Sequence, residues 1–201
     1  MRRTGPKTRL ARRVGEALRD KDTKYLQKRN YPPGMHGQNR IRRSEYGIQL
    51  LEKQKARWTY LVSERQFRRY VENSMRNKAL TSEVLLQFLE LRLDNVVYRL
   101  GFAASRAQGR QLASHGFLTV NGKKVTIPSY QVAVGDTVGV NPAKQTSKFL
   151  ALREPALKEF KPQEWLSLEP KSWTGKVIAK PTMENAGSTL QMDRIIEHYS
   201  R

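Results

Sequence analysis

Four basic residues in the middle of the chain have the spacing of an anion-binding surface. Arg106 and Arg110 are four positions apart, so on a helix they project from one face. Lys123 and Lys124 directly follow Asn121-Gly122, the pair typical of a tight hairpin turn. A guanidinium group binds a phosphate through two hydrogen bonds, and an ammonium group neutralises its charge. These residues together predict contact with the phosphates of RNA.

Basic residues also recur beside aromatic ones, as in Arg57-Trp58 and Arg69-Tyr70. Guanidinium groups and aromatic rings both stack on unpaired bases, which is how proteins read RNA loops. The cluster Arg65, Arg68 and Arg69 fits the solvated face of a helix equally well. The candidate RNA-binding side chains are Arg2, Arg3, Lys7, Arg9, Arg12, Arg13, Tyr31, His36, Arg40, Arg42, Arg43, Tyr46, Lys53, Lys55, Arg57, Arg65, Arg68, Arg69, Arg92, Arg106, Arg110, Gln111, His115, Asn121, Lys123, Lys124, Ser129 and Tyr130.

The charge of the chain favours the same kind of partner. Among 201 residues, 38 Lys and Arg stand against 18 Asp and Glu, a formal net charge of +20. A polyanion relieves the repulsion within such a chain and releases counterions when it binds. Residues 1–78 carry +15 of this charge. The binding surface is therefore expected to lie mainly in the first part of the chain.

Composition excludes several other classes of function. The chain has no Cys, so it has no disulfide and no thiolate metal site. Its three His residues lack the spacing of metal ligands, and no apolar run approaches the roughly 20 residues that span a bilayer. We expect no metal, no cofactor and no membrane. The basic start lacks the apolar segment of a secretory signal, which leads us to expect a cytoplasmic protein.

Residues 1–43 are predicted to be a basic extension that becomes ordered only on a partner, because few apolar residues recur in it. The segment 31–37 is rich in turn-forming residues and cannot be helical. A helix should begin near Ser44, with Ile48, Leu51, Lys55 and Trp58 along one face. Ser63 and Gln66 form a capping box that opens a second helix. A third should start near residue 81 and continue, with a bend, to Gly101.

The next stretch predicts helices that lead into a hairpin. Ser105 caps a helix over 106–114 that ends at Gly116. Strands are expected over 117–120 and 123–127, and a second hairpin over 132–140 with its turn at Gly135-Asp136. Residues 141–180 are predicted to be mostly loops, with one strand near 173–179. A final helix over 192–199 should dock on the helical part.

An enzyme is the main alternative. The triplet Arg92-Leu93-Asp94 is similar to the catalytic signature of certain pseudouridine synthases, which also carry an RNA-binding module. Here, however, the triplet precedes the module, and only about 50 residues follow it, too few for a catalytic domain. The sequence also lacks the Gly-rich phosphate-binding loop that is typical of nucleotide hydrolysis. A free RNA-binding translational repressor is a further alternative.

Several motifs in one order resemble the family of small-subunit ribosomal protein four. They include LRLDNVVYRLGFA at 91–103, HG at 115–116, VNG at 120–122 and IPSY at 127–130. Earlier come YPPG at 31–34, SEYG at 44–47 and ERQFRRY at 64–70, and the chain ends with YSR. The match covers most of residues 1–140 and the tail.

The resemblance implies an α+β fold, in which a helical domain contains an inserted mixed domain with a small antiparallel sheet. We therefore expect a basic extension over 1–43, a helical domain over 44–90 with 181–201, and an RNA-binding domain over 91–180 with its core at 91–140. The family binds 16S rRNA, nucleates assembly of the small subunit and supports translational accuracy. It lies near the channel by which mRNA enters, beside small-subunit proteins three and five, and no homo-oligomer is expected.

Three features depart from the family pattern. Thr8 and Ala11 stand where many relatives carry the first two of four zinc-binding cysteines. Gly109 replaces the usual Ala within a helix, at an expected cost of about 1 kcal/mol. Phe117 replaces the second His of the His-Gly-His sequence that is usual in the family. The start at Met1 with the family's own N-terminal sequence leads us to expect no transit peptide, in a bacterial or an organelle-encoded protein.

Overall fold

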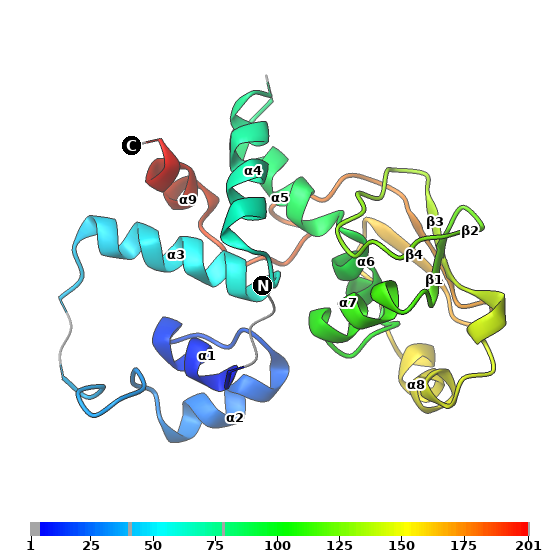
Figure 1. Cartoon of the computed structure of the whole chain (residues 1–201), viewed down its shortest axis with the longest axis horizontal. Helices are drawn as coiled ribbons and strands as arrows, with labels where there is room; N and C mark the ends of the chain where they lie inside the picture. Colours follow the sequence, from blue (N-terminus) through cyan, green and yellow to red (C-terminus); the bar gives the residue numbers. More distant parts are fainter. Residues whose placement is uncertain (1–4, 40–41, 78, 201) are drawn as a thin grey trace. The chain divides into compact units, whose positions relative to one another are not determined.

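The computed structural model describes residues 5–39, 42–77 and 79–200 (Figure 1). Contacts within it divide the chain into two units, Met1–Lys78 with Thr189–Arg201 and Ala79–Ser188. The α+β class is confirmed, because helices stand beside a small antiparallel sheet. The limits of the units differ from the expected domains, since residues 79–90 group with the second unit and the N-terminal segment groups with the first.

The first unit is helical. Its helices are α1 (Thr8–Val14), α2 (Asp20–Lys28), α3 (Glu45–Thr59), α4 (Glu64–Met75) and α9 (Met192–Tyr199). Helix α3 begins after Ser44 and Ser63 caps α4, both as predicted. Ser44 is also a cap, since each of the two side chains accepts a hydrogen bond from the backbone N–H three residues on. The last helix packs on α3, which confirms its predicted docking. Figure 1 shows α9, in red, beside α3.

The prediction of an N-terminal extension without its own order was wrong. Leu10 and Ala11 of α1 are buried, and Gly15 ends that helix with a φ of +87°. The Arg12 Nε donates to the carbonyl oxygen of Tyr31 at 3.1 Å, and its Nη2 donates to that of Pro32 at 3.3 Å. Arg12 thus ties α1 to the turn-rich segment, which is not helical, as predicted. Polar contacts supply the order that apolar periodicity did not reveal.

The predicted inner face of α3 was correct only for Lys55. Gln49, Lys53, Lys55 and Ala56 are its buried residues, whereas Ile48, Leu51 and Trp58 are only half-buried. Apart from Lys55, the prediction counted apolar side chains alone. In the structure, polar side chains that find partners occupy the inner face.

The second unit contains α5 (Thr81–Glu90), α6 (Leu93–Arg99), α7 (Arg106–Ser114), the short 3-10 helix η1 (Pro142–Lys144) and α8 (Lys148–Lys158). The expected continuous helix from residue 81 to Gly101 is two helices, because the backbone of Arg92 is extended and forms a bridge with Gln131. Gly101 lies in the left-handed region, with a φ of +79°, just after α6. Helix α8 was missed because Pro155 lies within it.

The sheet of this unit has the order β2-β1-β3-β5-β4, and all its pairs are antiparallel. Its strands are β1 (Leu118–Val120), β2 (Lys123–Lys124), β3 (Thr137–Val140), β4 (Leu166–Glu169) and β5 (Thr174–Val177). The hairpin turn is confirmed, with positive φ at both Asn121 and Gly122. β2 is shorter than predicted, and β4 was missed.

The second predicted hairpin was wrong, although its turn was correct. Only β3 forms, and it lies between β1 and β5. The carboxylate of Asp136 accepts a hydrogen bond from the N–H of Ala133 at 2.8 Å, so the segment before β3 closes into a turn and does not become a strand.

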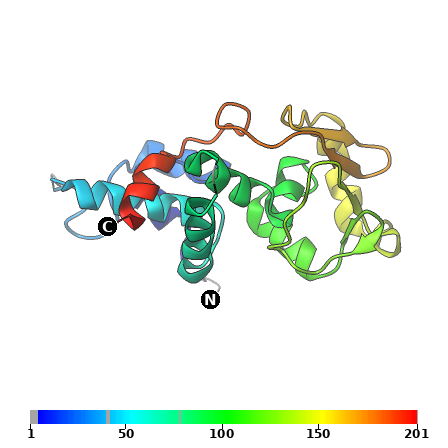
Figure 2. The same ribbon diagram turned by 90° about the horizontal axis from the view of Figure 1, so that it is seen from above.

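One face of the sheet forms the core of this unit. Its inward residues pack with α6 and α7, and with Leu157 of α8. Phe102 and Trp165 are fully buried there, while Leu168 and Trp173 pack at its edge. Figure 2 shows α6 and α7, in green, next to one another beside the sheet. This packing fixes α7 and the hairpin, which carry the predicted binding residues.

Candidate nucleic-acid interface

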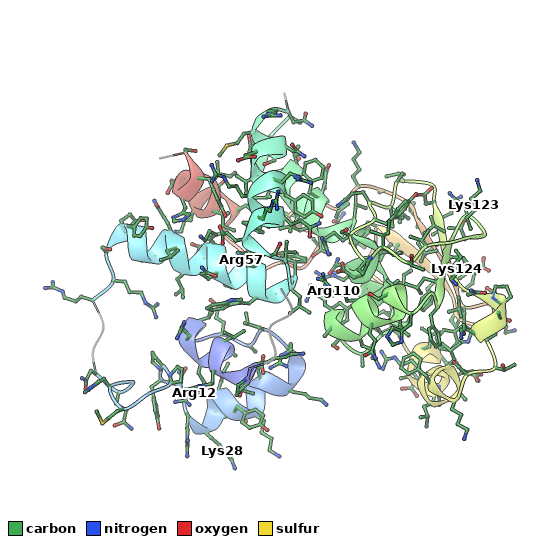
Figure 3. The ribbon with its side chains drawn as sticks, viewed as in Figure 1. Arg12, Lys28, Arg57, Arg110, Lys123 and Lys124 are labelled. Atoms are coloured by element: carbon green, nitrogen blue, oxygen red, sulfur yellow. The ribbon has the colours of Figure 1, made fainter. Side chains whose placement is uncertain are left out.

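The second unit presents its predicted cations in two groups, which we call the arginine group and the hairpin group. The arginine group is Arg106 and Arg110 on α7, and the hairpin group is Lys123 and Lys124 on β2. Both lysines are exposed, and 44% of the Arg110 side chain is exposed. Figure 3 shows Arg110 apart from the two lysines. The four residues therefore do not form a single cluster, but lie at two places on one unit.

The hairpin group lies against the end of α7. A Cβ atom at Gly116 would lie 2.5 Å from Cε of Lys124, so this lysine stem crosses directly over the glycine. His115, next to it, is exposed, as is Gln111 one turn earlier. Gly116 has a φ of +69°, which ends the helix and turns the chain into β1. The glycine thus allows Lys124 to reach the C-terminal end of α7.

The arginine group is held by α6. Nε of Arg106 donates to Oδ1 of Asn95 at 2.7 Å, and its guanidinium lies 4.8 Å from the ring centre of Tyr98. Nη1 of Arg110 is 4.0 Å from Oδ2 of Asp94. Two neighbouring residues of α6 thus approach two arginines that are one turn apart on α7.

Gly109 allows α6 and α7 to approach closely. A Cβ atom at this position would lie 2.4 Å from the backbone oxygen of Asp94. The expectation that this glycine only weakens the helix was therefore incomplete, because its missing side chain is what makes room for α6.

Arg92 does not contribute to the surface. Its side chain is fully buried, and its guanidinium donates to both carboxylate oxygens of Asp94, at 3.0 and 2.7 Å. Burial raises the pKa of Asp94, and the charge of Arg92 and its hydrogen bonds oppose that rise. The triplet that resembled a catalytic signature is therefore a buried ion pair within the fold.

The remaining predicted residues of this unit have mixed roles. Asn121 holds the sheet together, since it donates to Asp136 at 2.8 Å and accepts from the N–H of Thr137 at 2.9 Å. Ser129 is half-buried and Tyr130 is 38% exposed, in the loop after β2. Tyr130 therefore has a ring open for stacking.

In the first unit, most predicted cations of the N-terminal segment are exposed. They are Lys7, Arg9, Arg13, Arg42 and Arg43, together with the ring of His36. Arg12 is half-buried with its guanidinium 4.9 Å from the ring centre of Tyr31, so both residues build the fold. Arg2, Arg3 and Arg40 lie outside the described residues.

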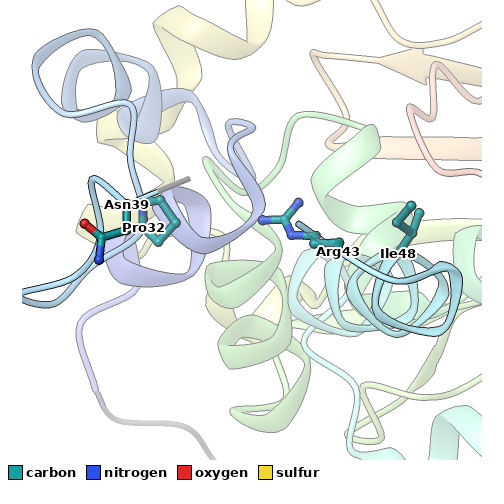
Figure 4. Close-up of a pocket in the computed structure, with 4 residues that line it drawn as sticks. All are labelled: Pro32, Asn39, Arg43 and Ile48. Carbon is teal, nitrogen blue, oxygen red and sulfur yellow. The ribbon is translucent and has the colours of Figure 1, made fainter. Parts of the chain in front are cut away.

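An open polar pocket lies at the start of α3. Pro32, Asn39, Arg43 and Ile48 line it, and Figure 4 shows the Arg43 guanidinium pointing toward the segment that carries Pro32 and Asn39. The Arg43 Nη2 is 3.5 Å from the backbone oxygen of Arg13, at the limit of a hydrogen bond. One cation of the N-terminal segment is thus turned toward α1.

The predicted cations of α3 are directed into the first unit. Nζ of Lys53 is 3.2 Å from Glu64, and Nζ of Lys55 is 2.8 Å from Glu16 and 2.9 Å from the backbone oxygen of Thr189. Arg57 also pairs with Glu64. These three residues are therefore structural.

The exposed predicted residues of the helices α3 and α4 are Tyr46 and three arginines. The ring centre of Tyr46 is 5.3 Å from that of His198, and 52% of the residue is exposed. Arg65, Arg68 and Arg69 are exposed along α4, and Arg68 pairs with Glu72 at 2.9 Å.

Sequence reasoning missed three lysines of α2. Lys21, Lys24 and Lys28 are spaced by three and four residues, so they share one helix face, and all are exposed. Exposed Tyr25 lies beside them, and Figure 3 shows Lys28 pointing away from the helix. The spacing of these lysines could have indicated a basic helix face. It did not lead to a prediction, because residues 1–43 were expected to form an extension without its own order.

In the ranges 5–39, 42–77 and 79–200, no three His, Asp or Glu side chains gather as metal ligands would. No helix in those ranges is both long and apolar enough to cross a membrane.

Known proteins are similar to this chain over nearly its whole length. Residues 2–90 match the family model of the ribosomal protein S4/S9 N-terminal domain, and residues 91–138 match that of the S4 domain. The chain is 48% identical to small ribosomal subunit protein uS4 of Roseiflexus sp. (strain RS-1) over 201 residues, which covers 98% of both chains. It is 48% identical to the protein of that name from Parabacteroides distasonis, over all of this chain and 99% of that one. The corresponding protein of Acetivibrio thermocellus is 46% identical over the same shares.

Proposed function

Because this chain belongs to the family of small ribosomal subunit protein uS4, we propose that it binds 16S rRNA through exposed cations on both of its units. The family assignment made from the motifs is confirmed. The protein is a structural, RNA-binding component of the small ribosomal subunit and is not an enzyme. The burial of Asp94 against Arg92 agrees with this, because a paired carboxylate inside the fold cannot reach a nucleotide.

On the second unit, the RNA contacts the arginine group and the hairpin group. The observation that carries this proposal is that Arg110, Lys123 and Lys124 are exposed within the segment that matches the S4 domain. RNA phosphates attract such cations by their charge. The exposed amide of Gln111 and the exposed ring of His115 add contacts that depend on the shape of the RNA. The full set is Arg106, Arg110, Gln111, His115, Lys123, Lys124, Ser129 and Tyr130.

On the first unit, exposed cations of the N-terminal segment and α4 contribute, joined by the lysines of α2. The set is Lys7, Arg9, Arg13, Lys21, Lys24, Lys28, His36, Arg42, Arg43, Tyr46, Arg65, Arg68 and Arg69, with Arg2, Arg3 and Arg40 as further candidates outside the described residues. Five predicted side chains are left out because they pair within the protein: Arg12, Lys53, Lys55, Arg57 and Arg92. Tyr31 and Asn121 act by shaping the surface.

The finer role follows from the family. The protein nucleates assembly of the small subunit and supports translational accuracy near the channel by which mRNA enters, with small-subunit proteins three and five as neighbours. The origin is bacterial or organellar. The similar chains described above come from bacteria, which favours a bacterial origin.

The salt dependence of RNA binding tests the surface. Lys123→Ala should weaken binding to a 16S rRNA transcript and lower the slope of log affinity against log salt by about 0.7–0.9, the value for one lost phosphate contact. Lys158→Ala is the matched control, because this lysine is exposed on α8 and pairs with Glu154. A slope unchanged by the hairpin substitution, in a folded variant, removes the hairpin group from the interface.

A further inference from the structure

The arginine group is connected to a buried carboxylate. Glu90, at the end of α5, is fully buried, and Arg99 donates to its two oxygens at 3.0 and 2.8 Å. Nδ2 of Asn95 donates to Oε2 of the same carboxylate at 2.7 Å, and also to the backbone oxygen of Glu90 at 2.8 Å. Asn95 is only 1% exposed, so the contacts of its side chain are made inside the protein.

This arrangement fixes which way the amide of Asn95 faces. Its two N–H bonds are directed at acceptors of Glu90, so its oxygen must face the other side, where Nε of Arg106 donates to it at 2.7 Å. The reverse orientation would place the amide oxygen against a carboxylate and the amide N–H against a guanidinium, which is unfavourable at both ends. Glu90 therefore sets the acceptor that Arg106 finds.

Arg106 is thereby held from two sides. Its Nε is bound by Asn95, and its guanidinium lies 4.8 Å from the centre of the Tyr98 ring. A long arginine side chain loses much rotational freedom when it binds a phosphate, and a side chain that is already fixed loses less. Fixing one edge of the planar guanidinium also fixes the direction of its Nη edge.

We propose that Asn95, oriented by Glu90, is a positioning residue that sets the guanidinium of Arg106 for one RNA phosphate. The inference rests on the proposed function, since it requires that Arg106 contacts RNA. Tyr98 acts in the same way through its ring. Glu90, Asn95 and Tyr98 do not touch the RNA, and their effect on affinity passes entirely through Arg106.

A double-mutant cycle tests this inference in the full chain with a 16S rRNA transcript. Arg106→Ala should weaken binding about tenfold, the scale of one charge-assisted contact. Asn95→Ala should weaken it about three- to tenfold in the wild-type background and in the Lys123→Ala background. In the Arg106→Ala background, Asn95→Ala should have no further effect. Equal weakening in every background overturns the inference, because it means that Asn95 supports the unit as a whole.

Two additions keep the test decisive. Should Asn95→Ala not fold, Tyr98→Leu replaces it in the same cycle, with the same expected results. In the free protein, the Nε–H resonance of Arg106 should exchange slowly with solvent, and Asn95→Ala or Tyr98→Leu should speed this exchange. An exchange rate unchanged by the substitution overturns the inference.

The same cycle separates failure of the inference from failure of the proposed function. If Arg106→Ala leaves affinity unchanged while Lys123→Ala weakens it, the positioning inference is overturned and the hairpin group stands. If neither substitution weakens binding, the proposed surface of the second unit fails, and the inference fails with it.

Discussion

The phenol of Tyr199 donates a hydrogen bond of 2.6 Å to Oε1 of Glu64. It joins α9, at the end of the chain, to the first turn of α4. Glu64 also pairs with Lys53 and Arg57 of α3, so one carboxylate connects three helices of the first unit. Burial and the bond to Glu64 both raise the pKa of Tyr199, which keeps the phenol protonated and able to donate.

Tyr199→Phe should therefore lower the stability of the protein by about 1 to 2 kcal/mol, because the substitution removes a hydrogen bond to a charged group and leaves the ring in place. Urea unfolding followed by circular dichroism measures this change. Tyr25→Phe is the matched control, since Tyr25 is 53% exposed, and it should change stability by less than about 0.5 kcal/mol. Equal effects of the two substitutions would contradict the role of this bond.

The same carboxylate predicts a dependence of stability on pH. Burial raises the pKa of Glu64, but the hydrogen bond from Tyr199 and the charges of Lys53 and Arg57 outweigh burial, and the net pKa is below 4.5. A carboxyl group with a lower pKa in the folded state stabilises that state when ionised. This stabilisation is present above pH 4.5 and is lost as the pH falls through the folded value.

Glu64→Gln should accordingly be less stable than the wild type at pH 7, and the difference should shrink as the solution becomes acidic. Unfolding free energies measured by urea titration at several pH values between neutrality and the acid transition test this. A difference that stays constant with pH would show that Glu64 acts by packing and not by its charge.

Gly109→Ala should destabilise the second unit, although Ala favours a helix by about 1 kcal/mol over Gly. The new Cβ would lie 2.4 Å from the backbone oxygen of Asp94, and moving α6 away from α7 should cost about 1 to 3 kcal/mol. Thermal unfolding measures the net loss. Gln111→Ala, at an exposed position of the same helix, serves as the control, and a gain in stability from Gly109→Ala would refute the steric argument.

Asp94→Ala should destabilise the protein by about 3 to 5 kcal/mol, because it leaves the fully buried guanidinium of Arg92 without its carboxylate. The loss of a merely catalytic aspartate would leave stability nearly unchanged. Urea unfolding distinguishes the two. A fully stable variant would contradict the structural role that we assign to this ion pair.

Local polar signals were the most reliable part of the sequence. Ser63 and Ser105 were predicted as helix caps, and each accepts a backbone hydrogen bond. The Asn121-Gly122 turn also forms as predicted. These signals depend on two to four neighbouring residues, so they rely little on distant parts of the chain.

Features set by distant partners could not be predicted. The partners of Lys55 lie at Glu16 and Thr189, and those of Arg12 lie about 20 residues further along the chain. Both cations were therefore assigned to RNA, when they hold the first unit together. The second hairpin failed for the same reason, because β3 finds its neighbours in β1 and β5.

Sedimentation of cell extracts in mild salt tests the central claim, that the protein is a component of the small ribosomal subunit and binds its RNA, most directly. The tagged protein should sediment with small subunits and with whole ribosomes, in about one copy for each 16S rRNA. Raising the salt should release it, since charge supplies much of its affinity. A protein that stays at the top of the gradient, away from the 16S rRNA, would contradict the account.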